Sequence, residues 1–210
     1  QGLFRNPLAA PGILGVNSGA ALGAAIMIVL GNAILPESLA EYTLYSIPAG
    51  AFICALAITG LIVKVGTVGG RTNIFILLLT GVALQAIIGA VMGLLTYISN
   101  DEELRSLTFW TMGDLGVAGW KELAFIIPIL SFCCFMIIRN AGALNLLLLG
   151  ESEAHHLGID VQKLKKSLII WTALAISLAV SFTGAIGFIG FTRPQPQIFS
   201  NDIFQVIDRI

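Results

Sequence analysis

The sequence predicts an all-α membrane protein, a polytopic bundle of transmembrane helices with about five spans. Hydrophobic residues make up 57% of its 210 positions and charged residues only 11%, whereas soluble domains carry about 25% charged residues. The mean hydropathy of +0.93 agrees with this shortage of charge. The charged residues also cluster between long apolar runs, which is the pattern of a chain embedded in a bilayer.

Five apolar runs are the expected spans, because a helix needs about 20 apolar residues to cross the hydrocarbon core. The fourth run is at the lower limit of this length and contains Pro128. The expected spans cover residues 15–35, 45–63, 74–98, 123–138 and 168–191. They form one predicted domain, residues 1–210, divided into an entry segment (1–14), spans one to four (15–149), a loop (150–166), span five (167–191) and an atypical tail (192–210).

The distribution of Lys and Arg between the loops predicts the orientation of the helices, because basic residues concentrate in cytoplasmic loops. One side of the predicted bundle carries only Arg105 and Lys121, together with several acidic residues. The other side carries seven basic residues: Arg5, Lys64, Arg71, Arg139, Lys163, Lys165 and Lys166. We therefore expect the second side to be cytoplasmic.

Glycines recur at a spacing of four residues in two spans. Gly15, Gly19 and Gly23 lie in the first span, and Gly89 and Gly93 in the third. Residues four apart share a helix face, so such glycines allow two helices to approach closely. Glycine is also frequent in membrane helices in general, but close packing is the interpretation that we favour for both sets.

Composition and motifs argue against several classes of function. The net charge of −1, without a basic patch, argues against nucleic-acid binding. The sequence contains no catalytic or metal-ligand motif, so we expect neither an enzyme nor a cofactor or metal bound by this chain. No charged residue lies deep in a predicted span, which argues against coupling to protons or sodium ions. Gln85, in the middle of the third span, is the best candidate to face a polar cavity.

The entry segment is the first of three stretches that are more than plain connectors. Pro7 and Pro11 bias the residues before them away from helix. Irregular backbone at membrane depth is tolerated where it lines a cavity or is buried in protein. The segment is therefore either part of a pathway or a capped loop at the membrane interface.

The second stretch is the loop at 150–166. Glu151 or Ser152 is expected to cap a short helix that Gly158 ends, and a second short helix is expected to start at Ile159–Asp160. Two short helices on the cytoplasmic side would form a compact docking knob. The alternative is an ordinary basic loop that only sets the topology.

The third stretch, residues 101–122, lies on the outer side. Leu107–Met112 is apolar and aromatic but too short to span the membrane. It fits an interfacial helix, with Trp110 and Trp120 near the lipid headgroups. The stretch is either the mouth of a pathway or an aromatic belt.

Five motifs resemble, in order, the signature of the permease subunits of FecCD-type (type II) ATP-binding cassette importers. The first includes Asn6-Pro7-Leu8-Ala9, and the fourth begins at Leu149-Gly150-Glu151. The five motifs occupy residues 1–15, 79–84, 110–113, 149–158 and 184–190. The order of the motifs makes the resemblance specific over residues 1–190. After Gly190 the chain departs from the pattern, and Gln195 stands where the family has histidine.

The resemblance implies a membrane permease whose five spans correspond to the middle helices of a ten-helix subunit. Such a subunit forms the translocation pathway for an iron-siderophore, the commonest case, or for haem or cobalamin. It lies in the cytoplasmic (inner) membrane of a bacterium or archaeon. The implied partners are a separate ATP-binding cassette ATPase that uses the ATP, an extracytoplasmic substrate-binding protein, a second permease copy and membrane lipid. The alternative is a truncated remnant of such a permease that transports nothing.

The resemblance also implies roles for particular residues. A cytoplasmic gate region would contain Asn6, Pro7 and Leu8. The candidates to line the pathway are Thr80, Gly81 and Gln85. The loop that couples the permease to its ATPase would contain Gly150, Glu151, Ser152, Ala154, Leu157 and Gly158.

Overall fold

The structure is a computed structural model that describes residues 12, 15–34, 43–69, 71–113 and 119–185. The helices in this part of the chain are α1 (Val16–Ile34), α2 (Thr43–Gly66), α3 (Ile74–Ile98), α4 (Asp101–Met112), α5 (Trp120–Arg139), α6 (Ala141–Leu149), α7 (Glu151–His156) and α8 (Val161–Thr183). Between α2 and α3, β1 (Thr67–Val68) and β2 (Arg71–Thr72) form a small antiparallel hairpin. The predicted all-α bundle is confirmed.

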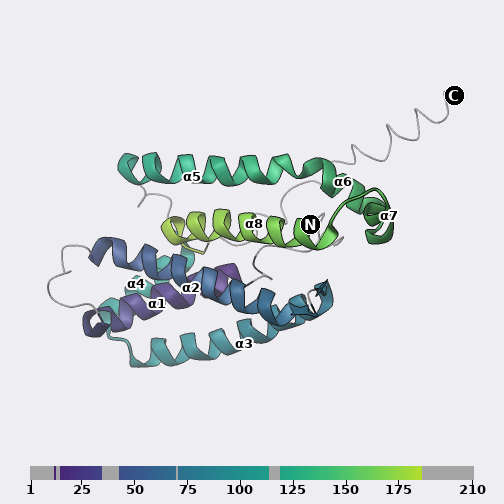
Figure 1. The fold of residues 1–210 in the computed structure, drawn as a ribbon. Helices are drawn as coiled ribbons and strands as arrows, with labels where there is room; N and C mark the ends of the chain where they lie inside the picture. The colour runs from purple at the N-terminus through teal and green to yellow at the C-terminus, as the bar shows by residue number, and fades with distance from the viewer. Residues whose placement is uncertain (1–11, 13–14, 35–42, 70, 114–118, 186–210) are drawn as a thin grey trace, which may run out of the picture.

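The long helices lie side by side along one direction (Figure 1). The pair α1 and α2 lies in the middle, with α3 on one side and α8 on the other, and α5 covers the far side of α8. The hairpin, α7 and the start of α8 lie at one end of the bundle. The last turn of α1, the first turn of α2 and the end of α8 lie at the opposite end (Figure 1).

Four helices of the described chain are long and apolar enough to cross a membrane: Tyr45–Gly66, Ile74–Ile98, Trp120–Arg139 and Val161–Thr183. The expected first span corresponds to α1, of which Val16–Gly31 counts as a shorter apolar helix. The fourth span is longer than the predicted 123–138, because α5 begins at Trp120 and continues through Pro128. These helices agree with the predicted polytopic arrangement.

The start of α8 differs from the prediction. The expected short helix at Ile159–Asp160 is the first turn of α8, which runs on without a break to Thr183. The Asp160 side chain caps this helix by accepting a hydrogen bond from the Lys163 backbone N–H at 3.1 Å. No Gly or Pro follows until Gly184, so nothing stops the helix between the lysines and the apolar span.

Glycines bring α1 and α2 into backbone contact. A Cβ atom at Gly19 would lie 3.0 Å from the Ala55 Cα, and one at Gly23 would lie 2.7 Å from the Cys54 Cβ. The predicted close packing is thus confirmed for the first span. At Gly89 and Gly93 a Cβ would meet no atom of the described chain within 4 Å, so close packing of the third span stays a prediction.

The core of the bundle lies where α1, α2, α3 and α8 meet. Its buried members are small or branched apolar residues: Val16, Ala20, Ala24, Ala51, Ala55, Ile62, Leu77, Ile169, Ala173 and Val180. Alanines predominate on α1 and α2, because helices in backbone contact leave no room for larger side chains.

Helix α4 is longer than the expected interfacial helix at 107–112. It begins at Asp101 because Asn100 and Glu103 form a capping box, in which each side chain accepts a hydrogen bond from the other's backbone N–H. Its Leu107 is buried against α1 and α3, beside Ala25 and Leu95. Helix α4 is therefore packed onto the bundle through one side.

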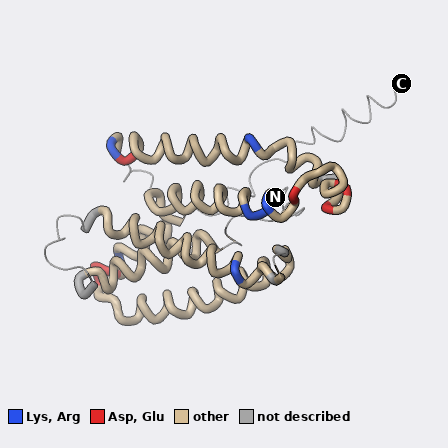
Figure 2. The backbone as a smooth tube through the Cα atoms, in the orientation of Figure 1, with Lys and Arg blue, Asp and Glu red and all other residues tan. Residues whose placement is uncertain are grey.

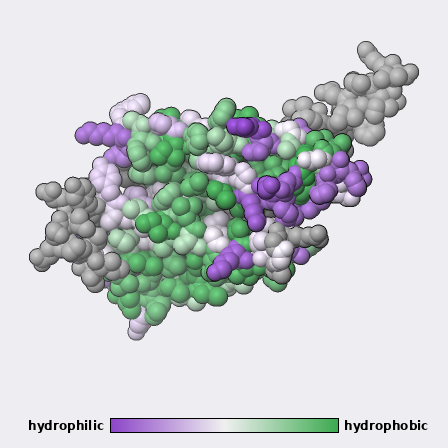
Figure 3. Space-filling model, viewed as in Figure 1, coloured by the Kyte–Doolittle hydropathy of each residue, from purple (hydrophilic) through white to green (hydrophobic). Residues whose placement is uncertain are grey.

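The two ends of the bundle differ in charge as predicted (Figure 2). Lys64, Arg139 and the lysines of α8 lie at the α7 end, whereas Arg105 and Lys121 lie at the other. Between them the visible surface is largely apolar (Figure 3). Large apolar side chains of the long helices are exposed, such as Phe75 of α3 at 85% and Phe125 of α5 at 65%. An apolar band between two polar ends is the surface that a bilayer requires.

Candidate functional site

The expected docking loop forms a compact knob at the basic end of the bundle (Figure 1). We call α6, α7 and the turn that leads into α8 the knob. Ala154 of α7 is fully buried and contacts Leu147 of α6 and Val161 of α8. Helix α6 is not among the predicted helices and lies between the expected fourth span and the loop at 150–166. This apolar contact fixes the short α7, which has too few residues to be stable alone.

A glycine lies at each end of α7. Gly150, with φ of 135°, is the N-cap, so the predicted cap by Glu151 or Ser152 is wrong. Gly158, with φ of 84°, ends the helix as predicted. There the N–H of Ile159 donates to the Ala154 carbonyl at 3.0 Å and the N–H of Gly158 to the His155 carbonyl at 3.0 Å. These two bonds form a Schellman motif, which favours glycine at the left-handed position.

An ion pair joins α7 to α8. The Lys165 ammonium lies 2.7 Å from the Glu151 carboxylate. Lys165 is only 3% exposed, whereas the Glu151 side chain is 49% exposed. A buried ammonium is strongly unfavourable without a partner, so Glu151 is needed for Lys165 to lie in this position.

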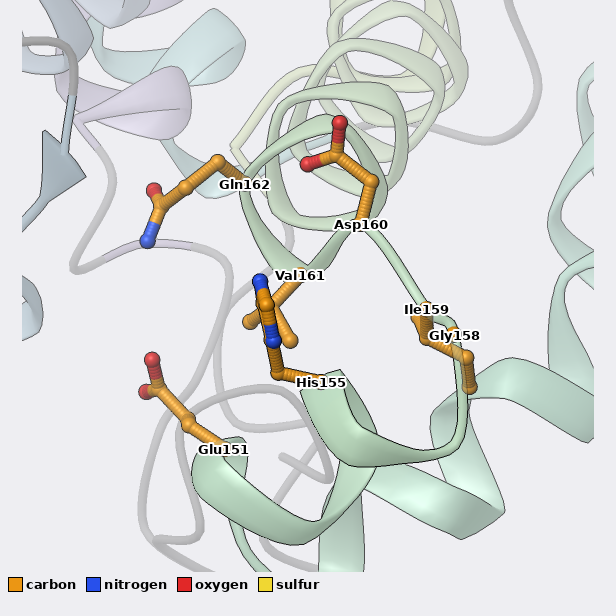
Figure 4. A pocket seen from close by; sticks show the side chains of 7 residues that line it. All are labelled: Glu151, His155, Gly158, Ile159, Asp160, Val161 and Gln162. Carbon is orange, nitrogen blue, oxygen red and sulfur yellow. The ribbon is translucent and has the colours of Figure 1, made fainter.

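A second polar contact joins α8 to the hairpin. The side-chain oxygen of Gln162 accepts a hydrogen bond from the backbone N–H of Thr72 at 2.9 Å. Gln162 also lines a hollow of about 530 Å³, along with Glu151 and His155 of α7 (Figure 4). The hollow shows that the polar side chains of α7 and α8 meet at one exposed place.

The carboxylate of Asp160 borders the same hollow and is exposed. Hydrogen bonding from the Lys163 backbone N–H is the main cause that lowers the pKa of Asp160 below its ordinary value. The Asp160 carboxylate, which caps α8, is therefore ionised at neutral pH. Among the described residues, no three His, Cys, Asp or Glu side chains come together as a metal site.

On α3, Gln85 binds the backbone before α1. Its side-chain amide donates to the Gly12 carbonyl at 2.6 Å. The same carbonyl accepts the Gly15 N–H at 2.9 Å. The structure thus fastens Gly12, the one described residue of the entry segment, to the middle of α3.

The other expected pathway residues are Thr80, which is partly buried, and Gly81, which is buried. Gly81 lies four residues before Gln85 on α3. Like Leu77 and Ile88, Gly81 is buried and lies on the face of α3 that packs against the bundle. Asn6, Pro7 and Leu8 lie outside the described residues. The gate and pathway roles stay predictions.

Replacing Gln85 by leucine is expected to weaken the attachment of the entry segment. The change removes one hydrogen bond, and the net loss should be about 1 kcal/mol in the free energy of unfolding. Reversible unfolding in mixed micelles measures it. Thr96→Val is the matched control, because the Thr96 hydroxyl bonds only the Met92 carbonyl of its own helix. Equal stability losses in both variants would contradict a special role for the Gln85 contact.

Sequence reasoning missed Lys165, Gln162 and Thr72 as parts of this site. Lys165 was counted only as a topology-setting charge, and the partners of Gln162 and Lys165 lie 90 and 14 residues away. No local pattern marks contacts of this kind. The i to i+4 spacing of Val161 and Lys165 was the available signal, because it places both on one face of a helix.

Comparisons with known proteins decide the family. The model of the FecCD transport family matches residues 1–200. The chain belongs to the FecCD transport family. The match extends past Gly190, where the motifs depart from the expected pattern, and into residues outside the described part.

Two named permease proteins are among the relatives of this FecCD chain. It is 46% identical over 194 residues to the hemin transport system permease protein HmuU of Yersinia pestis, covering 92% of this chain and 57% of HmuU. It is 36% identical over 194 residues to the cobalamin import system permease protein BtuC of Halobacterium salinarum, covering 92% of this chain and 50% of that protein. The chain thus spans about half the length of the curated relatives it matches.

A solved structure has the same fold. It is described as an inward-facing conformation of a metal-chelate type ABC transporter. The superposition has a TM-score of 0.77 at 30% identity, and it covers 90% of this chain and 58% of the other. The chain thus belongs to a transport family, and four of its described helices are long and apolar enough to cross a membrane.

Proposed function

We propose that this chain is part of the permease subunit of an ATP-binding cassette importer for metal chelates. The observation that carries the proposal is the knob, built at the basic end of an apolar bundle in a FecCD chain. A short helix held by glycine turns, a buried alanine and an ion pair has the rigidity that a docking element needs. A separate ATPase would bind the knob and hydrolyse the ATP.

Haem is the substrate that we propose first. The support is the 46% identity to a hemin permease, against 36% to a cobalamin permease. A ferric siderophore or cobalamin is the alternative within the same chemical class of metal chelates. The described chain has no charged group deep in its spans, which fits a pathway that uses ATP instead of an ion gradient.

The remaining parts of the proposal follow the same orientation. The basic end with α7 would face the cytoplasm, and the membrane would be the cytoplasmic membrane of a bacterium or archaeon. The entry segment, held by Gln85, would lie near a gate, and α3 would border the pathway. A second permease copy and an extracytoplasmic binding protein would complete the importer.

Uptake into proteoliposomes tests this function. The full-length subunit is reconstituted with its ATPase and binding protein, and haem, cobalamin and a ferric siderophore are supplied in separate assays. We expect uptake of haem that requires ATP and is absent with a hydrolysis-deficient ATPase. Vesicles that lack the ATPase are the second control. If none of the three chelates enters in an ATP-dependent way, the proposed function is wrong.

A further inference from the structure

The first turns of α8 contact two segments that are distant from each other in the chain. On one side they hold α7, which carries the knob. On the other side they hold the β1–β2 hairpin, which leads directly into α3. These contacts make a continuous polar and apolar connection from the knob to the proposed pathway helix.

The contact between α8 and α7 has two parts. Val161 packs against the buried Ala154, and Lys165 pairs with Glu151 at 2.7 Å. One residue is apolar and the other charged, and they lie one helical turn apart on α8. A displacement of α7 would therefore act on α8 through both the Val161–Ala154 packing and the Lys165–Glu151 ion pair.

The contact between α8 and the hairpin is the hydrogen bond from the Thr72 N–H to Gln162. Within the hairpin, the Thr67 and Thr72 hydroxyl oxygens lie 3.2 Å apart. The next residue, Asn73, donates its N–H to the Gly66 carbonyl at 2.9 Å and caps α3 with its side chain. The hairpin is thus firmly joined to the first turn of α3.

Helix α3 carries the connection further. A Cβ atom at Gly66 would lie 2.9 Å from the Leu77 Cβ, so the end of α2 and the start of α3 are in close contact. Further along α3, Gln85 holds the Gly12 carbonyl. A movement of the hairpin end of α3 would therefore reach the entry segment through packed and hydrogen-bonded groups.

We propose that the start of α8 transmits movement of α7 to the hairpin and α3, with Lys165 and Gln162 as the positioning residues. This inference rests on the proposed function, because the ATPase is what would move α7. Neither residue touches substrate or ATP. Lys165 acts through Glu151 on α7, and Gln162 acts through the Thr72 backbone on the hairpin.

Hydrogen exchange in the reconstituted full-length complex tests the connection. Exchange of peptides that cover α7 and the hairpin is measured with and without ATP, alongside substrate uptake per ATP hydrolysed. In the unaltered protein, ATP should change exchange in both segments. In Gln162→Leu and in Lys165→Met, ATP should still change α7 but no longer the hairpin, and uptake per ATP should fall by about tenfold.

Conservative variants and controls separate transmission from folding. Gln162→Glu keeps an acceptor for the Thr72 N–H, and Lys165→Arg keeps the charge, so both should retain much of the coupling. Lys64→Met is the control, because it removes an exposed charge at the same end of the bundle without altering the contacts of α8 or the hairpin described above. This control should behave as the unaltered protein does.

The possible results differ in what they overturn. If the hairpin still responds to ATP in Gln162→Leu and Lys165→Met, with normal uptake per ATP, the transmission role is wrong while the proposed function stands. If α7 shows no response to ATP in the unaltered complex and no chelate is taken up, the proposed function itself fails. If one variant does not fold, the other still decides between these results.

Discussion

Gly23→Ala is expected to destabilise the bundle by about 2 kcal/mol, the size of an overpacked core substitution. The added methyl group would overlap the backbone carbonyl of Gly50 and lie 2.7 Å from the Cys54 Cβ. Backbone atoms of a helix cannot turn aside as a flexible side chain can. Helices α1 and α2 must therefore separate, which loosens the alanine contacts of the core. Unfolding of the purified protein in mixed micelles, followed by tryptophan fluorescence, measures the loss.

Gly60→Ala is the matched control for this substitution. Gly60 lies in α2, is exposed, and has no atom within 4 Å of the position where a Cβ would stand. Its replacement should leave stability unchanged or raise it by up to about 1 kcal/mol, because alanine favours helix over glycine. If Gly23→Ala and Gly60→Ala give the same stability, the claim that α1 and α2 are in backbone contact at Gly23 is wrong.

Leu157→Ser is expected to weaken binding of the ATPase by roughly thirtyfold, which corresponds to about 2 kcal/mol for an apolar anchor. Leu157 lies at the end of α7 and is 59% exposed. An exposed leucine on a rigid polar knob is suited to a pocket on a partner. Titration of the ATPase onto the reconstituted permease measures the affinity, and ATP-dependent uptake should fall with it.

The stability of the permease should not change in Leu157→Ser, because the side chain contributes little to the core. Val65→Ser is the control: Val65 is 47% exposed, in the last turn of α2 at the same end of the bundle. Its replacement should leave ATPase affinity unchanged. Equal affinities for the Leu157 and Val65 variants would show that the knob does not contact the ATPase through Leu157.

The positions of the spans followed from the sequence because they depend on local chemistry. A run of apolar residues of sufficient length forms a helix wherever it meets a bilayer, since its backbone groups have no other partners there. The second and third expected spans agree closely with α2 and α3. The errors occurred at helix ends, as at α8, where the polar first turn was taken for a separate short helix.

The sequence motif singled out the loop at 150–166, whose docking role stays a prediction. Gly158 was correctly expected to end α7 because a left-handed turn needs glycine there. The ion pair of Glu151 with Lys165 could not be foreseen. In the sequence Lys165 is one of three similar lysines. Only the packing of α7 on α8 buries that one and leaves Lys163 and Lys166 exposed.

The sequence by itself determined that this chain is a multi-span membrane helix bundle, which end is basic, and to which family of permeases it is similar. These properties depend on composition, run length and short motifs. Only the tertiary structure decided which glycines bring helices into contact within the described residues: Gly19 and Gly23 meet α2, while no described atom lies near a Cβ at Gly89 or Gly93. It also brought Gln162 to Thr72 and Gln85 to Gly12. The physical reason is that these contacts join residues whose closeness depends on how whole helices pack, and not on the chain near them.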